Sequence, residues 1–491
     1  MPRTRRRHFV RRSGLSSTLW RCWRRQVKLQ CSRCARSWPL DPTRWRCDCG
    51  GVLEIVGAPS FDPARVDERD YTLWRYRAAL PLPDDAMTVT LGEGWTPLVA
   101  AEWDGQPVYL KAEYLNPTGS FKDRGAAVLV TALKAAGVRK VVEDSSGNAG
   151  TALAAYAARV GLSATVYVPA HASPVKQAQI AAYGAEVVAV PGPRGEAARA
   201  VRRALEEGAV YASHVYSPLY PQGMKTVAFE LWEQLGGRAP ESVVVPLGHG
   251  GLLLGLHAGF GELLAAGLIE RLPRLSGVQA QPCAPLARAW ERGAADVEPV
   301  EEGETVAEGV RIAAPPWGRA VLAAVRESNG AVLALPDEET LMAQRKLAHQ
   351  GFYVEPTSAL AVAALNHLRD RLGGTPVVVL TGSGFKSPPL MANRQQRVAL
   401  FAHRHDLLYD PSTHALDLVS EVGEVAKEVL LATDYGRRAP HFRPHLADEL
   451  GDALYSLLAL AEACGVDAEG ALGAALKKYE RRLIERGDAG S

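Results

Sequence analysis

Lys122 has the most distinctive chemical setting in the sequence. It closes the turn segment Asn116-Pro-Thr-Gly-Ser-Phe-Lys122-Asp-Arg-Gly125, which follows a predicted strand over Val108–Leu115. A lysine held at the start of a helix and partly withdrawn from water is the kind of amine that forms an imine with a carbonyl compound. One lysine alone means little, because most lysines are solvated charges. The prediction therefore depends on the residues that accompany it.

Two further turns have the composition of anion-binding loops. The turn at residues 144–150, Asp-Ser-Ser-Gly-Asn-Ala-Gly, follows a predicted strand, Lys140–Glu143, and opens a predicted helix, Thr151–Val160. The turn at residues 247–252, Leu-Gly-His-Gly-Gly-Leu, follows the predicted strand Ser242–Pro246 and also opens a helix. Backbone N–H groups at a helix N-terminus favour a carboxylate or a phosphate, and glycines let the backbone approach it closely.

A fourth turn, Thr381–Gly384, ends the predicted strand Val377–Leu380. All four turns therefore lie beyond the carboxyl ends of predicted strands, where open α/β sheets bind ligands. A single glycine-rich turn is more often a tight connection between a strand and a helix. Four in one chain indicate a shared site.

The elements that must position these turns occupy the middle of the chain. Residues 57–398 alternate short Val, Ile and Leu runs with Ala-rich amphipathic stretches, which predicts an α/β fold built on a parallel sheet. The whole chain has 491 residues, too many for one ordinary domain, and its 47% hydrophobic and 22% charged residues are typical of a soluble globular protein.

Charge and hydropathy exclude two classes of function. The net charge of +2 argues against a molecule built to bind polyanions. The most apolar region, Val243–Ile269, is interrupted by His249, His257 and Glu262, so no membrane-spanning segment is expected. With no secretory signal in view, the sequence predicts a cytoplasmic protein.

The four turns together resemble those of the fold-type-II pyridoxal-phosphate (PLP) enzymes, and within them the threonine synthase family. The resemblance covers roughly residues 29–390 and includes Gly92-Glu-Gly-Trp-Thr-Pro97 and Glu355-Pro-Thr-Ser-Ala359. It implies two open parallel-sheet subdomains around PLP, with Lys122 joined to the cofactor as a Schiff base.

The same resemblance implies roles for the other turn residues. Asn148 would bind the 3′-oxygen of PLP, and Thr381 would face the pyridine nitrogen. The PLP phosphate would be bound by Gly248, His249, Gly250, Gly251 and Leu252, and the carboxylate of an amino-acid substrate by Ser145, Ser146 and Gly147.

The implied enzyme is a PLP-dependent carbon–oxygen lyase that converts O-phosphohomoserine and water to threonine and phosphate. Leu252 stands where the family often has a polar residue, and Ser383 replaces the usual His of Thr-Gly-His-Gly. A serine/threonine ammonia-lyase of the same fold is the alternative. Asp123 favours the synthase, whereas the Gly-Gly-Leu sequence ending at Leu252 favours the ammonia-lyase.

A small cysteine-bearing module, residues 29–56, precedes the α/β region. Two cysteine pairs, Cys31 with Cys34 and Cys47 with Cys49, are separated by twelve residues. Four sulfurs so spaced can close a tetrahedral structural zinc site, as in the zinc-ribbon-like N-terminus of many threonine synthases. The alternative is four reduced thiols without a metal. Residues 1–28 form an arginine-rich tail, expected to be disordered, as either a solvated leader or a nucleic-acid-binding arm.

The C-terminal region, residues 403–487, has almost no strand pattern and is predicted to be helical. The polar stretch Asn393–Arg397, with His403–His405, is interpreted as a linker. Two amphipathic helices are predicted over Ala415–Ala432 and Leu446–Cys464.

Acidic residues recur three apart on both of these helices: Glu421 with Glu424, and Glu449 with Asp452. Carboxylates so arranged on facing helices can hold Mg²⁺ with waters and a diphosphate, although acidic side chains on a helix are more often simply solvated. With Lys478-Tyr479 and Arg482 downstream, the pattern resembles the MazG-like nucleotide pyrophosphohydrolases. That resemblance implies hydrolysis of a nucleoside triphosphate to a monophosphate and pyrophosphate, and a homo-oligomer. A purely assembling role for these helices is the alternative.

Overall fold

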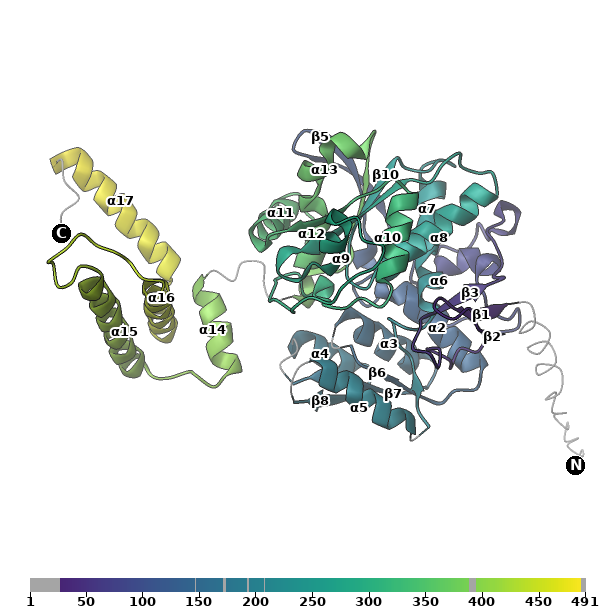
Figure 1. Cartoon of the computed structure of the whole chain (residues 1–491), viewed down its shortest axis with the longest axis horizontal. Coiled ribbons are helices and arrows are strands. Elements are labelled where there is room, and N and C mark those ends of the chain that lie inside the picture. The colour runs from purple at the N-terminus through teal and green to yellow at the C-terminus, as the bar shows by residue number, and fades with distance from the viewer. Residues whose placement is uncertain are drawn as a thin grey trace, which may run out of the picture. The chain divides into compact units, whose positions relative to one another are not determined.

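The protein is described here by a computed structural model that covers residues 27–145, 147–170, 174–191, 194–206, 208–387 and 394–486. The chain separates into two compact units, residues 1–387 and 388–491 (Figure 1). Most of the predicted basic tail, residues 1–28, lies outside the described residues. Among the described helices, none combines the length and the apolar character needed to cross a membrane.

The cysteine-bearing module forms a three-stranded antiparallel sheet with β1 at its centre. Its strands are β1 (Lys28–Cys31), β2 (Ser37–Pro39) and β3 (Leu53–Val56). Leu29 and Leu53 are fully buried in the core that this sheet shares with the rest of the first unit. The ring of Trp45 packs edge-on against Tyr211, with centroids 5.0 Å apart, so the module is fixed to the α/β region.

The larger sheet of the first unit has six strands in the order β12-β11-β10-β13-β5-β4. Every neighbouring pair is parallel except β4 and β5. The strands are β4 (Leu98–Trp103), β5 (Gln106–Lys111), β10 (Ser242–Pro246), β11 (Arg274–Ala280), β12 (Val332–Leu335) and β13 (Val377–Val379). The residues of β10 and β13 are buried on both faces, as expected for central strands of a parallel sheet.

The smaller α/β sheet has four parallel strands in the order β8-β7-β6-β9. They are β6 (Lys140–Glu143), β7 (Ser163–Pro169), β8 (Glu186–Val190) and β9 (Val210–Tyr211). The first unit therefore contains the two open parallel-sheet subdomains that the sequence predicted.

Helices cover both α/β sheets, and three of them, α2, α3 and α8, begin at the predicted ligand-binding turns (Figure 1). The α-helices of this unit are α2 (Lys122–Ala135), α3 (Asn148–Arg159), α4 (Pro174–Ala182), α5 (Arg194–Glu206), α6 (Tyr220–Met224), α7 (Thr226–Gln234), α8 (Gly251–Ala265), α9 (Pro285–Glu291), α10 (Gly318–Glu327), α11 (Asp337–His349), α12 (Pro356–Ala363) and α13 (Leu365–Leu372). The short 3₁₀ helices are η1 (Pro63–Arg65), η2 (Leu73–Ala79), η3 (Glu113–Leu115), η4 (Gln281–Cys283), η5 (Glu308–Val310) and η6 (Gly384–Lys386).

Two predicted boundaries in this unit are wrong by about a turn. The strand predicted over Val108–Leu115 ends at Lys111, because Glu113 turns inward to bind a buried arginine and residues 113–115 form η3. The helix predicted from Thr151 begins at Asn148, where Gly147 in an extended conformation provides the N-cap.

Residues 394–486 of the second unit form four helices: α14 (Arg394–Arg404), α15 (Pro411–Ala432), α16 (His445–Ala463) and α17 (Ala468–Arg486). The linker predicted over Asn393–Arg397 is wrong, since α14 begins at Arg394. Asp410 caps α15 by accepting hydrogen bonds from the backbone N–H groups of Ser412 and Thr413.

Helices α15 and α16 pack antiparallel. The early part of α15 contacts the later part of α16, and the later part of α15 contacts the residues just before α16. The hydroxyl of Ser456 donates to Asp417 at 2.6 Å, and the guanidinium of Arg443 donates to Glu428 at 2.7 Å. The apolar side chains expected on one side of α15 do not all face α16: Val419 and Val422 are 70% and 53% exposed. Between these two contacts, the facing turns of α15 and α16 bring acidic side chains together.

Candidate active site

Lys122 is the first residue of α2, and its turn is bonded to the turn that follows β13. The backbone N–H of Phe121 donates to the carbonyl of Thr381 at 3.0 Å, and that of Ser383 donates to Gly119 at 2.9 Å. Gly119 has a φ of 84°, a conformation that favours glycine. Because β5 and β13 are parallel neighbours, their carboxyl ends place these two predicted motifs side by side.

The amine of Lys122 lies among aromatic rings. Its Nζ is 4.8 Å from the ring centroid of Phe121 and 5.7 Å from that of Tyr220. The hydroxyl of Tyr220 donates to the backbone carbonyl of Lys122 at 2.9 Å. A Cβ at Gly125 would clash with the Tyr220 ring, so glycine lets this ring pack against α2. These contacts hold the lysine in a partly desolvated setting, as imine chemistry requires.

Asn148, at the start of α3, has one half of its amide engaged and the other half open. Its Nδ2 donates to Glu355 at 3.0 Å, whereas its buried Oδ1 accepts no hydrogen bond from the described residues. Ser145 and Gly147 lie just before this helix, with the Gly147 N–H 3.4 Å from the Ser145 hydroxyl oxygen. Ser146, the third predicted carboxylate-binding residue, lies outside the described residues.

The glycine-rich loop at residues 248–251 leads directly into the N-terminus of α8. Gly250 has a φ of 89°, and a Cβ there would clash with Val321. Nothing lies within 4 Å of the position that a Cβ of Gly251 would occupy, so space remains at the helix N-terminus for an anion. Leu252 is buried, and its side chain packs in the hydrophobic core.

Thr381 is buried at the end of β13, and its Oγ1 lies 3.1 Å from the hydroxyl of Ser358. The Ser358 hydroxyl also accepts a hydrogen bond of 2.8 Å from the N–H of Gly382. This pairing fixes the threonine hydroxyl beside the Lys122 turn. A neutral hydroxyl is the partner that the resemblance assigns to the pyridine nitrogen.

Two buried ionisable groups lie beside the Lys122 turn: Asp123, which the sequence linked only to the choice of substrate, and Lys386, which it did not predict as a site residue. Asp123 accepts hydrogen bonds from the backbone N–H of Thr118 at 2.7 Å and from its hydroxyl, while Lys386 donates to the Thr118 carbonyl at 2.8 Å. Burial raises the pKa of Asp123 to about 7 and lowers the pKa of Lys386 to about 8. The signal that could have found Lys386 is its place two residues after the Thr381–Gly384 turn.

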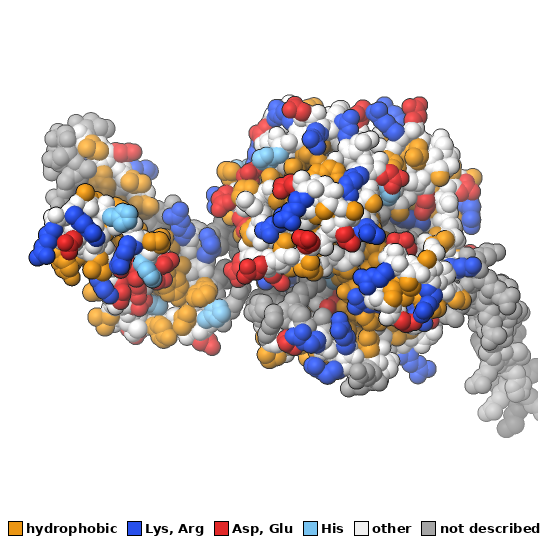
Figure 2. Space-filling view, viewed as in Figure 1, with side chains coloured by type: hydrophobic (Ala, Val, Ile, Leu, Met, Phe, Trp, Pro, Cys, Tyr) orange, Lys and Arg blue, Asp and Glu red, His pale blue; other side chains and the backbone are white. Residues whose placement is uncertain are grey.

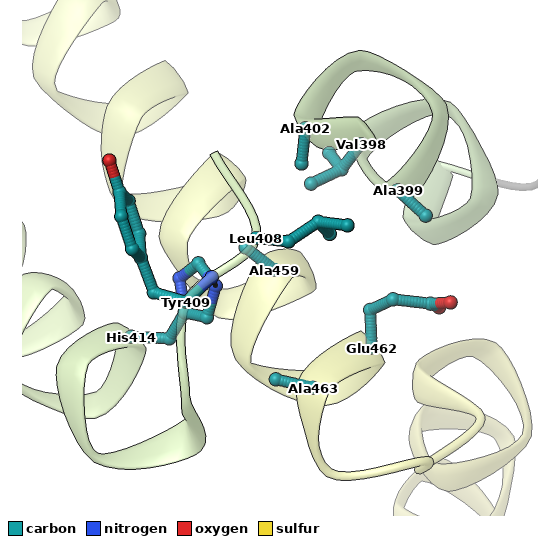
Figure 3. A pocket seen from close by; sticks show the side chains of 9 residues that line it. All are labelled: Val398, Ala399, Ala402, Leu408, Tyr409, His414, Ala459, Glu462 and Ala463. Carbon is teal, nitrogen blue, oxygen red and sulfur yellow. Dashed lines mark hydrogen bonds between the residues drawn. The ribbon is translucent and has the colours of Figure 1, made fainter. Parts of the chain in front are cut away.

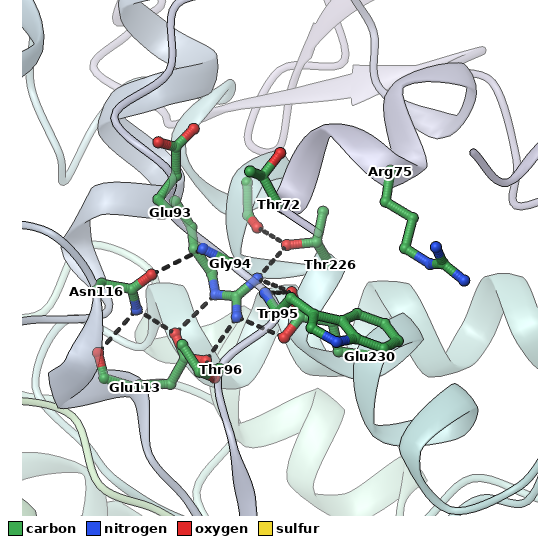
Figure 4. A network of polar contacts seen from close by, with 12 residues as sticks. Thr72, Arg75, Glu93, Gly94, Trp95, Thr96, Glu113, Asn116, Thr226 and Glu230 are labelled. Carbon is green, nitrogen blue, oxygen red and sulfur yellow. Dashed lines mark hydrogen bonds and ion pairs between the residues drawn. The ribbon is translucent and has the colours of Figure 1, made fainter. Parts of the chain in front are cut away.

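A buried network of ion pairs and hydrogen bonds surrounds Arg124 near the start of α2 (Figure 4). The guanidinium of Arg124 donates to Glu113 at 2.7 Å and to Glu230 at 2.5 Å, and Lys111 donates to Glu230 at 2.7 Å. Burial opposes ionisation of Glu230, but Arg124 and Lys111 outweigh it and lower the pKa of Glu230 to about 2. The N–H of Trp95 also donates to Glu230 at 2.8 Å, so the network anchors the segment of residues 92–97.

These residues fit the PLP group that the sequence implies. Four groups converge at the carboxyl ends of the strands. They are an amine at the start of a helix, an amide with an open buried oxygen, glycines with free space at a second helix N-terminus, and a fixed hydroxyl. The predicted residues that the structure describes thus lie together.

The four cysteines of the small module are also brought together. Their sulfurs all lie within 4.8 Å of one another, with Cys31 3.5 Å from Cys49 and Cys34 3.6 Å from Cys47. Burial opposes ionisation of Cys31, but backbone N–H groups of Cys34 and Arg33 outweigh it and lower the pKa of Cys31 to about 6. Burial and the neighbouring thiols raise the pKa of Cys47 to about 12, so one thiolate forms easily and further ionisation is opposed. A cation among the four sulfurs would relieve that opposition.

In the second unit, three of the four predicted carboxylates form one group. Oxygens of Glu421, Glu449 and Asp452 lie within 4.8 Å of one another, and Glu424 is not part of the group. Partial burial, together with Asp417 and the other carboxylates, raises the pKa of Glu421. Mutual repulsion of this kind is relieved by a cation.

A separate cavity of about 140 Å³ lies between α14 and the ends of α15 and α16 (Figure 3). His414 lies at its wall and accepts a 3.3 Å hydrogen bond from the N–H of Tyr409. Most of the lining is apolar, and none of it belongs to the carboxylate group. The lining residues are Val398, Ala399, Ala402, Leu408, Tyr409, His414, Ala459, Glu462 and Ala463.

Comparison with known proteins gives a separate account of both units. Residues 89–384 match the family of pyridoxal-phosphate dependent enzymes, and residues 410–486 match the MazG nucleotide pyrophosphohydrolase domain. The threonine synthase of Methanocaldococcus jannaschii is 36% identical over 375 residues, which is 73% of this chain and 93% of that protein. The threonine synthase of Mycobacterium leprae is 38% identical over 64% of this chain and 88% of that protein.

Solved structures with the same fold include enzymes of other names. A threonine deaminase from T.th. is 32% identical, with a TM-score of 0.52, and the match covers 59% of this chain and 92% of that chain. A serine racemase from Dictyostelium discoideum, at 23% identity and a TM-score of 0.51 over 59% of this chain and 92% of that one, shows the fold alone.

Proposed function

This chain belongs to the family of pyridoxal-phosphate dependent enzymes and ends in a MazG domain, and from that premise we propose that it converts O-phosphohomoserine and water to threonine and phosphate. The observation that carries the proposal is the convergence of Lys122, Asn148 and Thr381 with the glycine loop at residues 248–251. The similarity to threonine synthases over most of the first unit supports the choice of substrate.

Each of these residues has a definite task in the proposed reaction. PLP, when bound, supplies an electron sink for the carbon skeleton of the substrate. Lys122 holds the cofactor through its amine and moves protons at the substrate. Asn148 would bind the 3′-oxygen, Gly248 to Leu252 would bind the phosphate through their main chain and His249, and Thr381 would orient the ring. Ser145 to Gly147 would bind the substrate carboxylate.

The proposal is tested by incubating the purified protein with PLP and O-phosphohomoserine and measuring threonine and phosphate together. Equal release of both, absent in Lys122→Ala, is the expected result. A protein that binds PLP but releases neither product would contradict this substrate.

The second candidate is a serine/threonine ammonia-lyase. Leu252, buried at the start of α8, and the 32% identity to a threonine deaminase favour it. This activity predicts ammonia and a 2-oxo acid from threonine or serine. Measuring both products under the conditions of the first assay separates the two candidates.

For the small module we propose a structural zinc ion bound by Cys31, Cys34, Cys47 and Cys49. The four adjacent sulfurs and the N–H groups directed at Cys31 support it. Metal analysis should find one zinc per chain, and Cys47→Ser should lose it. The exposed Cys464, in the second unit, gives the matched control Cys464→Ser, and a zinc content below about 0.1 per wild-type chain would contradict the proposal.

For the second unit we propose Mg²⁺-dependent hydrolysis of a nucleoside triphosphate to monophosphate and pyrophosphate. Glu421, Glu449 and Asp452 would be the ligands, with Glu424 joining through a water. Glu449→Gln should abolish Mg²⁺-dependent pyrophosphate release, whereas Glu480→Gln, on the exposed side of α17, should not. Equal rates in all three proteins would leave an assembling role for this unit.

A further inference from the structure

A buried pair of an acid and a histidine lies at the candidate active site and has no role in the function proposed above. Strands β6 and β9 are parallel neighbours, with Val142 opposite Tyr211. The carboxyl ends of the two strands therefore meet at the same edge of the sheet, which brings Glu143, the last residue of β6, next to His214, three residues after β9. Nδ1 of His214 lies 2.5 Å from Oε1 of Glu143, and the two side chains are 7% and 1% exposed.

The imidazole of His214 also contacts two other parts of the site. Its ring centroid lies 6.1 Å from that of Tyr220, the same ring that lies 5.7 Å from Nζ of Lys122. It lies 5.6 Å from the ring of His249, which belongs to the glycine loop. His214 is thus in contact range of the lysine's neighbour and the glycine loop, while its partner Glu143 lies two residues before Ser145.

Titratable groups around His214 include Glu143 from β6, Tyr220 from α6 and His249 from the loop before α8. Burial, with Glu143 and Asp123 nearby, raises the pKa of Tyr220 well above its usual value, so this phenol stays protonated. Asp144, beside Glu143, accepts a 2.8 Å hydrogen bond from the hydroxyl of Tyr211. Glu143 is therefore the carboxylate that orients the imidazole.

The proposed reaction needs a proton at the leaving group. When the Cγ–O bond of a phosphate ester breaks, the oxygen keeps the electron pair, and an ester dianion would have to depart as a trianion. A proton donor within reach allows it to depart as hydrogen phosphate, and imidazolium is the commonest donor near neutral pH. A carboxylate bonded to the far nitrogen favours the imidazolium form and fixes the ring.

We propose that His214, positioned by Glu143, donates the proton on its Nε2 to the leaving-group oxygen of the substrate. The Cγ–O bond breaks, its electron pair stays on oxygen, and that oxygen takes the proton. The electron pair of the adjacent Cβ–H bond turns the Cβ–Cγ single bond into a double bond, and Lys122 accepts the Cβ proton. His214 is left neutral, still bonded to Glu143, and regains a proton from water. This assignment deepens the proposed function and rests on it.

The test compares two substrates that share a carbon skeleton. O-phosphohomoserine has a leaving group that needs a proton, whereas 2-amino-4-chlorobutanoate releases chloride, which needs none. His214→Gln should lower kcat for phosphate release about 100-fold, in the range of general acid catalysis, and change chloride release by less than about threefold. Glu143→Gln should show the same selectivity with a smaller loss of about tenfold, as expected of a positioning residue.

The matched control is His367→Gln. His367 and Glu339 form another pair of a histidine and a glutamate, with Nε2 of His367 2.7 Å from the carboxylate, on the surface between α13 and α11. This variant should leave both rates unchanged. Equal losses on both substrates in His214→Gln would assign the pair a structural role and overturn the proposal, as would full phosphate release.

A binding measurement keeps the test independent of turnover. Sulfate keeps its charge between pH 6 and pH 8.5, so a change in its affinity reports protonation of the protein. Calorimetric titration of the PLP-loaded wild type should show sulfate binding about tenfold weaker at pH 8.5, corresponding to the loss of one favourable charge contact. Asp123 and Lys386, with pKa values of about 7 and about 8, also titrate in this interval, so the comparison is between proteins: the pH dependence of the sulfate affinity should be clearly smaller in His214→Gln than in the wild type. If the wild type converts neither substrate, the proposed function fails. If, in addition, sulfate binds the wild type equally well at both pH values, the role of His214 is overturned as well.

Discussion

Lys122 and Asp123 are adjacent in sequence but have different tasks at the start of α2. Lys122 is held among rings by Tyr220, while Asp123 turns under the helix to bind Thr118. Removing the amine of Lys122 should therefore abolish covalent attachment of the cofactor and leave the fold intact. Lys122→Ala should show no covalent PLP after borohydride reduction and tryptic mass mapping, with an unfolding midpoint within about 2 °C of wild type, since an exposed or half-buried truncation costs little. PLP recovered on another lysine at wild-type yield would contradict the assignment.

Asp123 gives a prediction about pH and stability. Burial raises its pKa to about 7, compared with about 4 in an unfolded chain. Between these values the folded protein holds a proton that the unfolded chain releases, so the free energy of unfolding should fall as pH rises from about 4 to about 7, by at most about 1.4 kcal/mol per pH unit. Urea unfolding of the first unit should show this slope in the wild type and not in Asp123→Asn.

Asp370→Asn is the control for this pH series, because Asp370 is exposed on α13. It should keep the slope of the wild type. A slope that survives in Asp123→Asn would mean that another group carries the proton.

At the scale of single residues, the sequence predicted the groups that belong to contiguous motifs. Lys122, Asn148 and Thr381 each follow a strand, so a local pattern was enough to find them. His214 and Lys386 were not predicted as site residues, because what makes them notable is a partner from another element: Glu143 in one case and Thr118 in the other. Pairing across strands is set by the sheet order, which no local pattern contains.

At the scale of elements, the ionic network around Arg124 joins α2, η3 and α7. Arg124→Met would leave Glu113 and Glu230 buried with Lys111 as their remaining cation, and breaking such a network costs about 3–5 kcal/mol. Chemical denaturation of the first unit should show a loss of this size. Arg199→Met, which removes an exposed pair with Glu196 on α5, should cost less than about 1 kcal/mol.

Most elements were predictable from periodicity, and the errors occur where polar groups decide the boundary. The strand ending at Lys111 stops because Glu113 must reach Arg124, although Tyr114 and Leu115 continue the apolar pattern. Likewise α14 begins at Arg394, inside the polar stretch that was predicted to be a linker. There Gln395 donates to the carbonyl of Val466 at 2.8 Å, a tertiary contact that the local sequence does not indicate.

At the scale of the whole molecule, the second unit exposes apolar side chains that a lone helical bundle would be expected to cover. Leu450, Leu454 and Leu457 on α16 are 52%, 42% and 48% exposed, and Figure 2 shows hydrophobic and acidic side chains side by side on the visible face of this unit. Surfaces of this kind usually bind a partner. The predicted homo-oligomer would bury them between copies of this chain.

The corresponding prediction concerns the mass of the assembly. Val422→Glu combined with Leu454→Glu should lower the mass measured by light scattering, because each glutamate would have to be desolvated at the contact. Lys427→Glu, at another exposed position of α15, is the control and should leave the mass unchanged. An assembly of wild-type mass in the double variant would show that these faces do not hold copies together.

The position of β13 at the centre of the six-stranded sheet has a consequence for synthesis on the ribosome. This strand is the last of its sheet in the chain, yet it separates β10 from β5. Until residues 377–379 have emerged, both neighbouring strands present unpaired edges, which are prone to join other chains. Thr381 and the Lys122 turn also meet only then. A nascent chain can therefore neither complete its main sheet nor retain its cofactor before nearly the whole first unit has been translated, and holding by a chaperone during that interval should raise the yield of active protein.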